Sequence, residues 1–204
     1  MKKLILLLAL FSFIVQLNAQ EYGIEDVGKS MNKFGVKLGV NFANFSSNPT
    51  DPKYSNSTKF PYIGMLSRMN ISKVFILQTE FGYNILGANY DLFEGAGPVK
   101  ISLGYITIGA IMKAYFLRNI GFNVHLGLQY GYLVYGHQND LDIMNNYKSS
   151  DFDLAAGVGY DFDFGMLVEL RYLLGLSNVS NLQDIHYASI IKNRAIQLQL
   201  GWMF

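Results

Sequence analysis

The sequence predicts an all-β protein, an eight-stranded antiparallel up-and-down barrel, and three observations lead to this fold. Eight segments between residues 33 and 204 alternate an apolar side chain with a polar or small one, which is the period of a β-strand with two different faces. The connections between these segments are alternately long and short. An export signal precedes them, and no later apolar run is long enough for a membrane-spanning helix. Together these features predict a transmembrane β-barrel.

The N-terminal residues have the three parts of a secretory signal peptide. Lys2 and Lys3 supply the charge, Leu4 to Val15 form an apolar core, and Ala19 offers a small residue for cleavage. The core of about twelve residues is shorter than the roughly 20 that a spanning helix needs. We therefore expect residues 1–19 to be a signal peptide, residues 20–32 a polar lead in the periplasm, and residues 33–204 the barrel.

The alternation places the strands and leaves polar, Gly-containing or Pro-containing segments between them. We expect strands at residues 33–45, 60–71, 74–86, 100–116, 120–132, 152–161, 166–177 and 193–204. We expect long loops at 46–59, 87–99, 136–150 and 178–191, and short turns at 72–73, 117–119 and 162–164. Transmembrane barrels place short turns in the periplasm and longer loops outside the cell.

The last of these segments runs to the C-terminus of the chain. Its apolar face consists of Ile196, Leu198, Leu200, Trp202 and Phe204, and its other face is polar or small. This segment resembles the closing strand of outer-membrane barrels. The resemblance implies that the terminal aromatic residue is read by the barrel-assembly machinery.

The composition excludes several classes of protein. Charged residues make up 15% of the chain, below the roughly 25% of soluble domains. The net charge of +1 argues against a nucleic-acid partner. The chain has no Cys, which excludes disulfides, thiolate metal sites, Cys nucleophiles and lipid attachment at an N-terminal Cys.

Charged side chains fall on the polar face of several predicted strands. These residues are Lys37, Arg68, Glu80, Lys113, Glu169 and Arg171. Because the interior of an eight-stranded barrel is just wide enough for side chains to fill it, we expect an ion-pair network that plugs the lumen. The alternative is a polar path or a catalytic cluster at the same positions.

The remaining candidate site residues are three histidines and one acidic tripeptide. His125 faces inward by parity, and in a lipid-modifying barrel enzyme such a base would pair with a Ser and an acid, but no Ser lies beside it on its strand. His137 and His186 fall in predicted loops. Asp140-Leu141-Asp142 lacks the following Gly and the distal Glu of a calcium loop. We therefore predict no catalytic residue, no metal site and no cofactor.

Several segments resemble the small outer-membrane β-barrel family described as porin-family or PorT-like. They are Gly104-Tyr105-Ile106-Thr107-Ile108, Lys113-Ala114-Tyr115-Phe116, Gly127 to Leu133, Gly157-Val158-Gly159-Tyr160, Arg171-Tyr172 with Gly175-Leu176, and Asn193 to Phe204. Thr107 stands where the family often has an acidic residue, and Gly109-Ala110 replaces a frequent Pro. The resemblance implies the fold and an outer-membrane location, and one branch of the family serves a secretion apparatus.

The function expected from these observations is that of a non-enzymatic outer-membrane barrel with a structural or interaction role through its extracellular loops, including association with a secretion apparatus. The alternatives are a lipid-modifying barrel enzyme, a small-solute porin, and a soluble exported barrel that binds a ligand inside. The expected partners are outer-membrane lipid, the assembly machinery at the C-terminal strand and envelope proteins at the loops.

Overall fold

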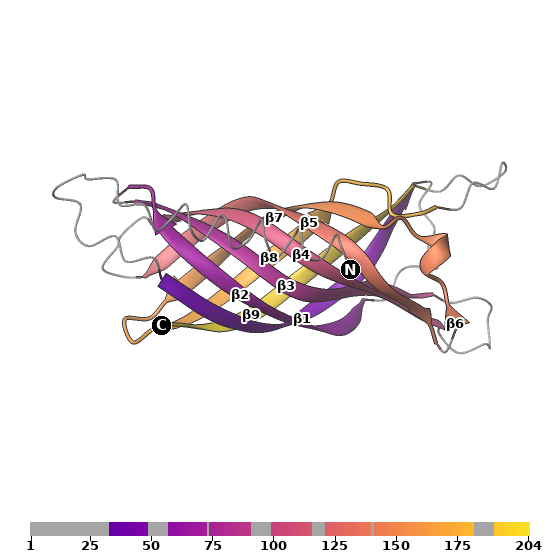
Figure 1. Ribbon diagram of the computed structural model, residues 1–204, viewed down its shortest axis with the longest axis horizontal. Coiled ribbons are helices and arrows are strands. Elements are labelled where there is room, and N and C mark those ends of the chain that lie inside the picture. The colour runs from indigo at the N-terminus through magenta and orange to yellow at the C-terminus, as the bar shows by residue number, and fades with distance from the viewer. Residues whose placement is uncertain are drawn as a thin grey trace, which may run out of the picture.

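A computed structural model shows a barrel of eight antiparallel strands (Figure 1). The structure describes residues 33–48, 57–72, 74–90, 99–115, 121–139, 141–181 and 190–204. The predicted signal peptide at 1–19, the lead at 20–32 and the turn at 117–119 lie outside these ranges.

Strand pairing closes the barrel between its first and last strands, which no hairpin connects. The elements are β1 (Lys33–Asn48), β2 (Thr58–Asn70), β3 (Phe75–Tyr90), β4 (Val99–Tyr115), β5 (Phe122–Gln138), β6 (Leu141–Asp142), the 3-10 helix η3 (Met144–Asn146), β7 (Ser150–Asp161), β8 (Met166–Gly175) and β9 (Ile190–Met203). Neighbouring strands pair in the order β4-β3-β2-β1-β9-β8-β7-β5, and β5 also pairs with β4. The first and last strands, β1 and β9, therefore form one seam of a closed cylinder. The predicted eight-stranded fold is confirmed.

The alternation in the sequence corresponds to the inside and the outside of this barrel. Leu38 on β1 and Leu200 on β9 face each other across the seam and are 61% and 56% exposed. Their chain neighbours Lys37 and Gln199 are 0% and 1% exposed. The apolar belt therefore points outward, which rules out the soluble barrel with an apolar interior.

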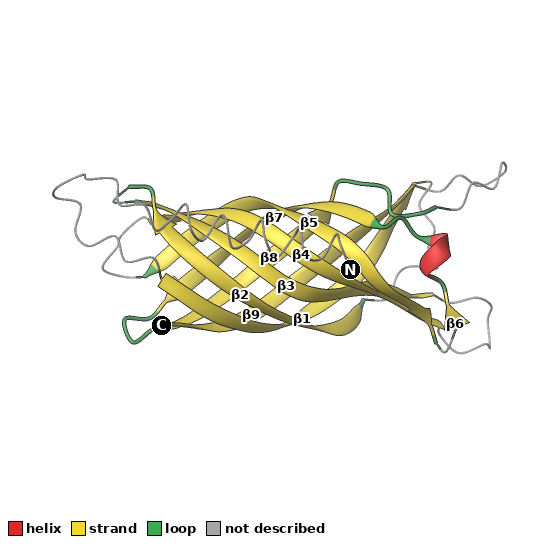
Figure 2. Ribbon diagram, viewed as in Figure 1, coloured by secondary structure: helices red, strands yellow, loops and turns green. Residues whose placement is uncertain are grey.

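The two ends of the barrel are built differently. The end with the C-terminus has short connections, which we call the turn end, and the opposite end carries β6 and η3, which we call the loop end (Figures 1 and 2). At the turn end, Phe162 N–H donates to Met166 O at 2.8 Å, and Gly165 adopts a φ of 101° that favours glycine. The predicted turn at 162–164 is thereby confirmed.

The predicted loops at 46–59, 87–99, 136–150 and 178–191 were too long at the loop end. β1 continues to Asn48, β3 to Tyr90 and β5 to Gln138, while β9 already begins at Ile190. The segment 136–150 also contains β6 and η3. The error has a physical cause: polar residues such as Ser46 and Ser47 still pair with β9, because the ladder joins backbone groups whatever the side chain.

The interior has an apolar layer toward the loop end. Its members are buried and come from six strands and two connections: Phe45, Phe60, Leu86, Leu103, Leu133, Ile143, Val179 and Ile191. We call this set the loop-end apolar layer. This layer lies in the part of the lumen next to the loop end, and the inward charged residues lie nearer the turn end.

Candidate functional site

The candidate site is a cluster of seven charged side chains inside the barrel, which we call the luminal charge cluster. Its four cations come from β1, β2, β4 and β8, and its three carboxylates from β3, β7 and β8: Lys37, Arg68, Lys113, Arg171, Glu80, Asp161 and Glu169. The strand pattern places each of them inward. The predicted luminal ion-pair network is confirmed.

Glu169 and Glu80 at the centre each accept from several cations. Glu169 accepts from Lys37 at 3.0 Å, from Lys113 at 2.8 Å and from Arg171 at 2.9 Å. Glu80 accepts from Lys37 at 2.7 Å and from both terminal nitrogens of Arg171 at 2.8 Å. These side chains are almost entirely buried, so several charge-assisted hydrogen bonds must offset the cost of removing each charge from water.

A second group of contacts ties the cluster to the turn end of the barrel. The Arg68 guanidinium donates to both oxygens of Asp161, at 2.7 and 3.2 Å, and Lys113 Nζ lies 3.4 Å from the same carboxylate. The Tyr115 hydroxyl also donates to Asp161. The sequence did not single out Asp161, and its role as the third carboxylate could be recognised only from the strand register.

Amide side chains continue the network toward the loop end. The Asn41 amide donates to Asn84 Oδ1 at 2.6 Å, and the Gln197 amide donates to Asn41 Oδ1 at 2.7 Å. Gln199 Oε1 accepts from Lys37 Nζ at 3.0 Å and so joins this amide layer to the luminal charge cluster. The hydrogen bonds therefore run across the lumen between strands that are distant in sequence.

Asp151 and Asp153 form a separate acidic pair on β7, which the sequence did not single out. Asp151 accepts from the Asn193 amide at 2.6 Å and from the Ser177 hydroxyl. Asp153 is 2% exposed. Within the described ranges, its Oδ2 accepts a long hydrogen bond of 3.5 Å from the Gln129 amide, and its Oδ1 has no hydrogen-bond partner. No ion pair in the described part of the chain reaches either carboxylate.

His125 is buried in the lumen, as its parity predicted, but it is not part of a catalytic arrangement in the described residues. Its cross-strand neighbours are Lys113 on β4 and Gly157 on β7, and neither ring nitrogen has a hydrogen-bond partner there. The imidazole lies so close to Gly157 that a Cβ at that position would come within 2.6 Å of Nε2. The histidine is therefore packed against bare backbone rather than paired with a hydroxyl.

The remaining predicted candidates lie apart. His137 stacks on Tyr135 near the loop end, with ring centroids 4.3 Å apart. The Asp142 carboxylate accepts from the Met144 N–H at 2.9 Å and so shapes the turn before η3. His186 and Asp140 lie outside the described residues. Within the described ranges, no three His, Cys, Asp or Glu side chains gather in a way that could hold a metal ion.

Solved structures of other proteins share this barrel architecture. None of the described helices is long and apolar enough to cross a membrane. Neisserial surface protein A has a similar solved structure, with a TM-score of 0.55 and 15% identity over 84% of this chain and 97% of that chain. The outer membrane protein OprG from Pseudomonas aeruginosa matches with a TM-score of 0.48 and 12% identity, over 87% of this chain and 98% of that one. No curated protein matches the sequence.

The family follows from the sequence itself. The model of the outer membrane protein beta-barrel domain matches residues 18–181, which is most of the chain. The fold, the outward apolar belt and this match agree on an outer-membrane location. The chain therefore belongs to the outer membrane protein beta-barrel domain family.

Proposed function

We propose that the protein is a non-enzymatic outer-membrane barrel that carries no solute and binds envelope partners through its loop end. The observation that carries this proposal is the filling of the lumen. The luminal charge cluster occupies the half toward the turn end, and the loop-end apolar layer occupies the half above it. A transport path would require these paired charges and packed side chains to separate.

The loop end supports a binding role because two of its connections hold each other in a defined shape. Lys148 N–H donates to Val179 O at 2.8 Å, and Asn181 N–H donates to Asn146 O at 2.9 Å. Below them, the Phe45 and Tyr147 rings stack at 6.3 Å. Leu141 of β6 is 69% exposed at the edge of this surface. A preformed surface loses less conformational entropy when a partner binds.

The closed lumen is tested by recording single-channel currents from the purified protein in planar bilayers. We expect no stable conductance. Large, stable openings would contradict the proposal and favour the small-solute porin, with the luminal charge cluster lining its path. Release of fatty acid from supplied outer-membrane lipid, abolished by His125→Gln, would instead favour the lipid-modifying enzyme.

The binding role is tested by capture from detergent-solubilised native membranes with a protein that carries an affinity tag in the lead at residues 20–32, so that Phe204 stays free. A variant with residues 141–147 replaced by a Gly/Ser segment of equal length serves as the control. We expect envelope proteins that are captured by the wild type and lost with the variant. A secretion-apparatus subunit among them would place the barrel in such an assembly, whereas identical capture by both would contradict loop-end binding.

We also propose that the barrel-assembly machinery recognises β9. Phe204 is 77% exposed, and its N–H donates to Phe34 O at 2.8 Å, so its ring projects from the seam. Phe204→Ala should lower the amount of folded barrel in the outer membrane without changing refolding in vesicles. Phe164→Ala, which removes an exposed aromatic ring from the same end of the barrel, is the matched control.

A further inference from the structure

The outward face of the barrel carries its charge at one end only. Within the described ranges, the outward positions of the eight barrel strands hold four basic residues and no carboxylate. The four are Lys59, Lys100, Lys192 and Arg194, and all lie near the loop end. None of them takes part in an ion pair in the described part of the chain. Cations above an apolar belt that have no ion-pair partner among the described residues are placed to bind an anionic group of the surrounding membrane.

Three of these cations converge on β1 beside the seam, two from β9 on one side and one from β2 on the other. Arg194 and Lys192 on β9 face Asn44 and Ser46 on β1. Lys59 on β2 faces Phe42 on β1, and its Nζ lies 5.8 Å from the centroid of that ring, so the ammonium leans over β1. The two outer strands are separated by two strand spacings, about 10 Å. We call Lys59, Lys192 and Arg194 the seam cations.

The fourth cation, Lys100, belongs elsewhere. Its Nζ lies 4.7 Å from the centroid of the Phe60 ring, and Phe60 belongs to the loop-end apolar layer. Lys100 therefore reaches over the mouth of the barrel and not toward the seam.

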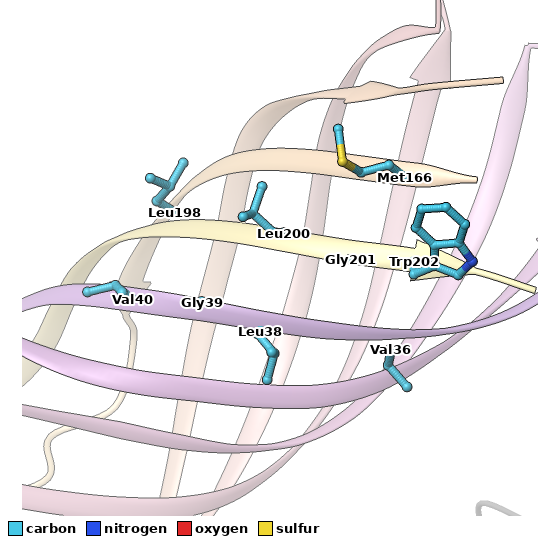
Figure 3. A pocket seen from close by; sticks show the side chains of 9 residues that line it. All are labelled: Val36, Leu38, Gly39, Val40, Met166, Leu198, Leu200, Gly201 and Trp202. Atoms are coloured by element: carbon cyan, nitrogen blue, oxygen red, sulfur yellow. The ribbon is translucent and has the colours of Figure 1, made fainter. Parts of the chain in front are cut away.

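An apolar groove of about 500 Å³ follows the same seam below the seam cations (Figure 3). One wall consists of Val36, Leu38 and Val40 on β1, and the other of Leu198, Leu200 and Trp202 on β9. In Figure 3 Leu198, Leu200 and Trp202 point to one side of the seam and Leu38 and Val36 to the other, with Gly39 and Gly201 on the strands between them. The upper end at Leu198 is four residues from Arg194, about 13 Å along the strand.

We propose that this seam binds a phosphorylated glycolipid of the outer leaflet. The seam cations hold its phosphate groups, and one of its acyl chains runs down the seam over Phe42 and Ile196 into the groove. Charge complementarity selects this occupant, because a second copy of the chain would bring like charges together at the same place. A lipid of the inner leaflet would place its headgroup at the turn end, where the described strands expose one cation, Lys33, and no cluster of cations.

The proposal is tested with the full chain refolded in phosphatidylcholine vesicles that contain lipid A, either bisphosphorylated or enzymatically dephosphorylated. The retained lipid is measured by native mass spectrometry after extraction. The test variant is Lys59→Gln/Lys192→Gln/Arg194→Gln. The matched control, Lys33→Gln/Lys100→Gln/Lys148→Gln, makes the same change in charge at exposed residues other than the seam cations. The gel mobility of the folded barrel shows that both variants refold.

We expect the wild type and the control to retain bisphosphorylated lipid A at least tenfold more than the test variant, and dephosphorylated lipid A to be retained weakly by all three. Inorganic phosphate at millimolar concentration should not displace the lipid. Val40→Trp, which narrows the groove without changing charge, should also reduce retention. Equal retention by the test variant and the control would overturn the proposal. So would full displacement by phosphate, which would indicate a site for the free anion, or a lipid-free dimer, which would indicate a second copy on the seam.

Discussion

At the scale of single residues, the number of ion-pair partners decides how much each luminal charge contributes to the stability of the barrel. Glu169 accepts from three cations, whereas in the described part of the chain Arg171 donates to Glu80 and Glu169 alone, and both carboxylates also contact Lys37. Glu169→Gln would leave four cations facing two carboxylates, while Arg171→Gln would leave three facing three. We expect Glu169→Gln to lower the free energy of unfolding by about 3–5 kcal/mol and Arg171→Gln by about 1–3 kcal/mol.

Denaturant titration of the barrel in vesicles, followed by its gel mobility, measures both values. From the sequence, Glu169 and Arg171 would form a pair, so removing Arg171 alone would cost more than replacing both with Gln. The structure changes this expectation, because Glu80 and Glu169 keep Lys37 when Arg171 is lost, whereas the double change leaves Lys113 with Asp161 alone. Equal costs for the two single variants would show that the charges do not act through the observed contacts.

The acidic pair gives a prediction of the opposite sign. Asp153 is buried and contacts no cation among the described residues, whereas Asp161 on the same strand contacts Arg68 and Lys113. Asp153→Asn should therefore raise the free energy of unfolding by about 1–3 kcal/mol, because it removes a poorly compensated charge. Asp161→Asn, the same chemical change eight residues further along β7, should lower it by a similar amount. Destabilisation by both changes would mean that Asp153 has a partner that the described contacts do not include.

At the scale of the strand, neighbouring residues with opposite orientations allow a matched comparison. Leu128 on β5 is 57% exposed on the apolar belt, whereas Gln129 is 3% exposed and faces Asp153. Leu128→Lys should cost about 2–4 kcal/mol if the site lies near the bilayer midplane. Gln129→Lys should cost little or stabilise the barrel, because it places a cation beside an unpaired carboxylate.

The readout is refolding equilibrium in vesicles of two hydrocarbon thicknesses. The Leu128→Lys penalty should change with thickness and the Gln129→Lys effect should not. Gln129 is a better control position than the luminal Gln199, because Gln199 contacts Lys37 and a lysine there would meet a cation already present. Equal effects of lysine at 128 and 129 would contradict the orientation of β5.

The strands also show what a sequence pattern can predict. The orientation of Lys37, Glu80 and Arg171 followed from period-2 alternation, because each strand has one face in lipid and one in the lumen. The ends of the strands at the loop end did not follow, since hydrogen-bonded ribbons continue through residues such as Ser46 and Gln138 that have loop-like side chains. β6 and η3 are too short to give a periodic signal.

The contacts inside the barrel were beyond sequence reasoning for a different reason. Lys37 and Glu80 are 43 residues apart and lie on β1 and β3, so their pairing depends on the register of β2 between them. A shift of two residues would keep every side chain on its face and change every partner. Parity could therefore predict that charges meet in the lumen, but not that Glu169 accepts from three cations or that Asp153 has none.

At the scale of the whole molecule, the arrangement of short turns and long connections predicts which end faces the outside of the cell. A peptide tag inserted at Asn145, between β6 and β7, should be accessible to antibody on intact cells. The same tag at Asp163, in the turn between β7 and β8, should become accessible only after the outer membrane is opened. Labelling of the Asp163 tag on intact cells would reverse the topology.

The seam between β1 and β9 has a consequence for how the barrel folds. Lys37 on β1 and Gln199 on β9 are hydrogen-bonded although 162 residues separate them, and fourteen register pairs join the same two strands. Such long-range pairing gives a high contact order, so the entropy of closing the chain is lost before the last contacts form. We infer that closure of this seam is the slow step of folding, and that until it occurs β1 and β9 present unpaired backbone edges, which the hydrocarbon of the membrane does not tolerate.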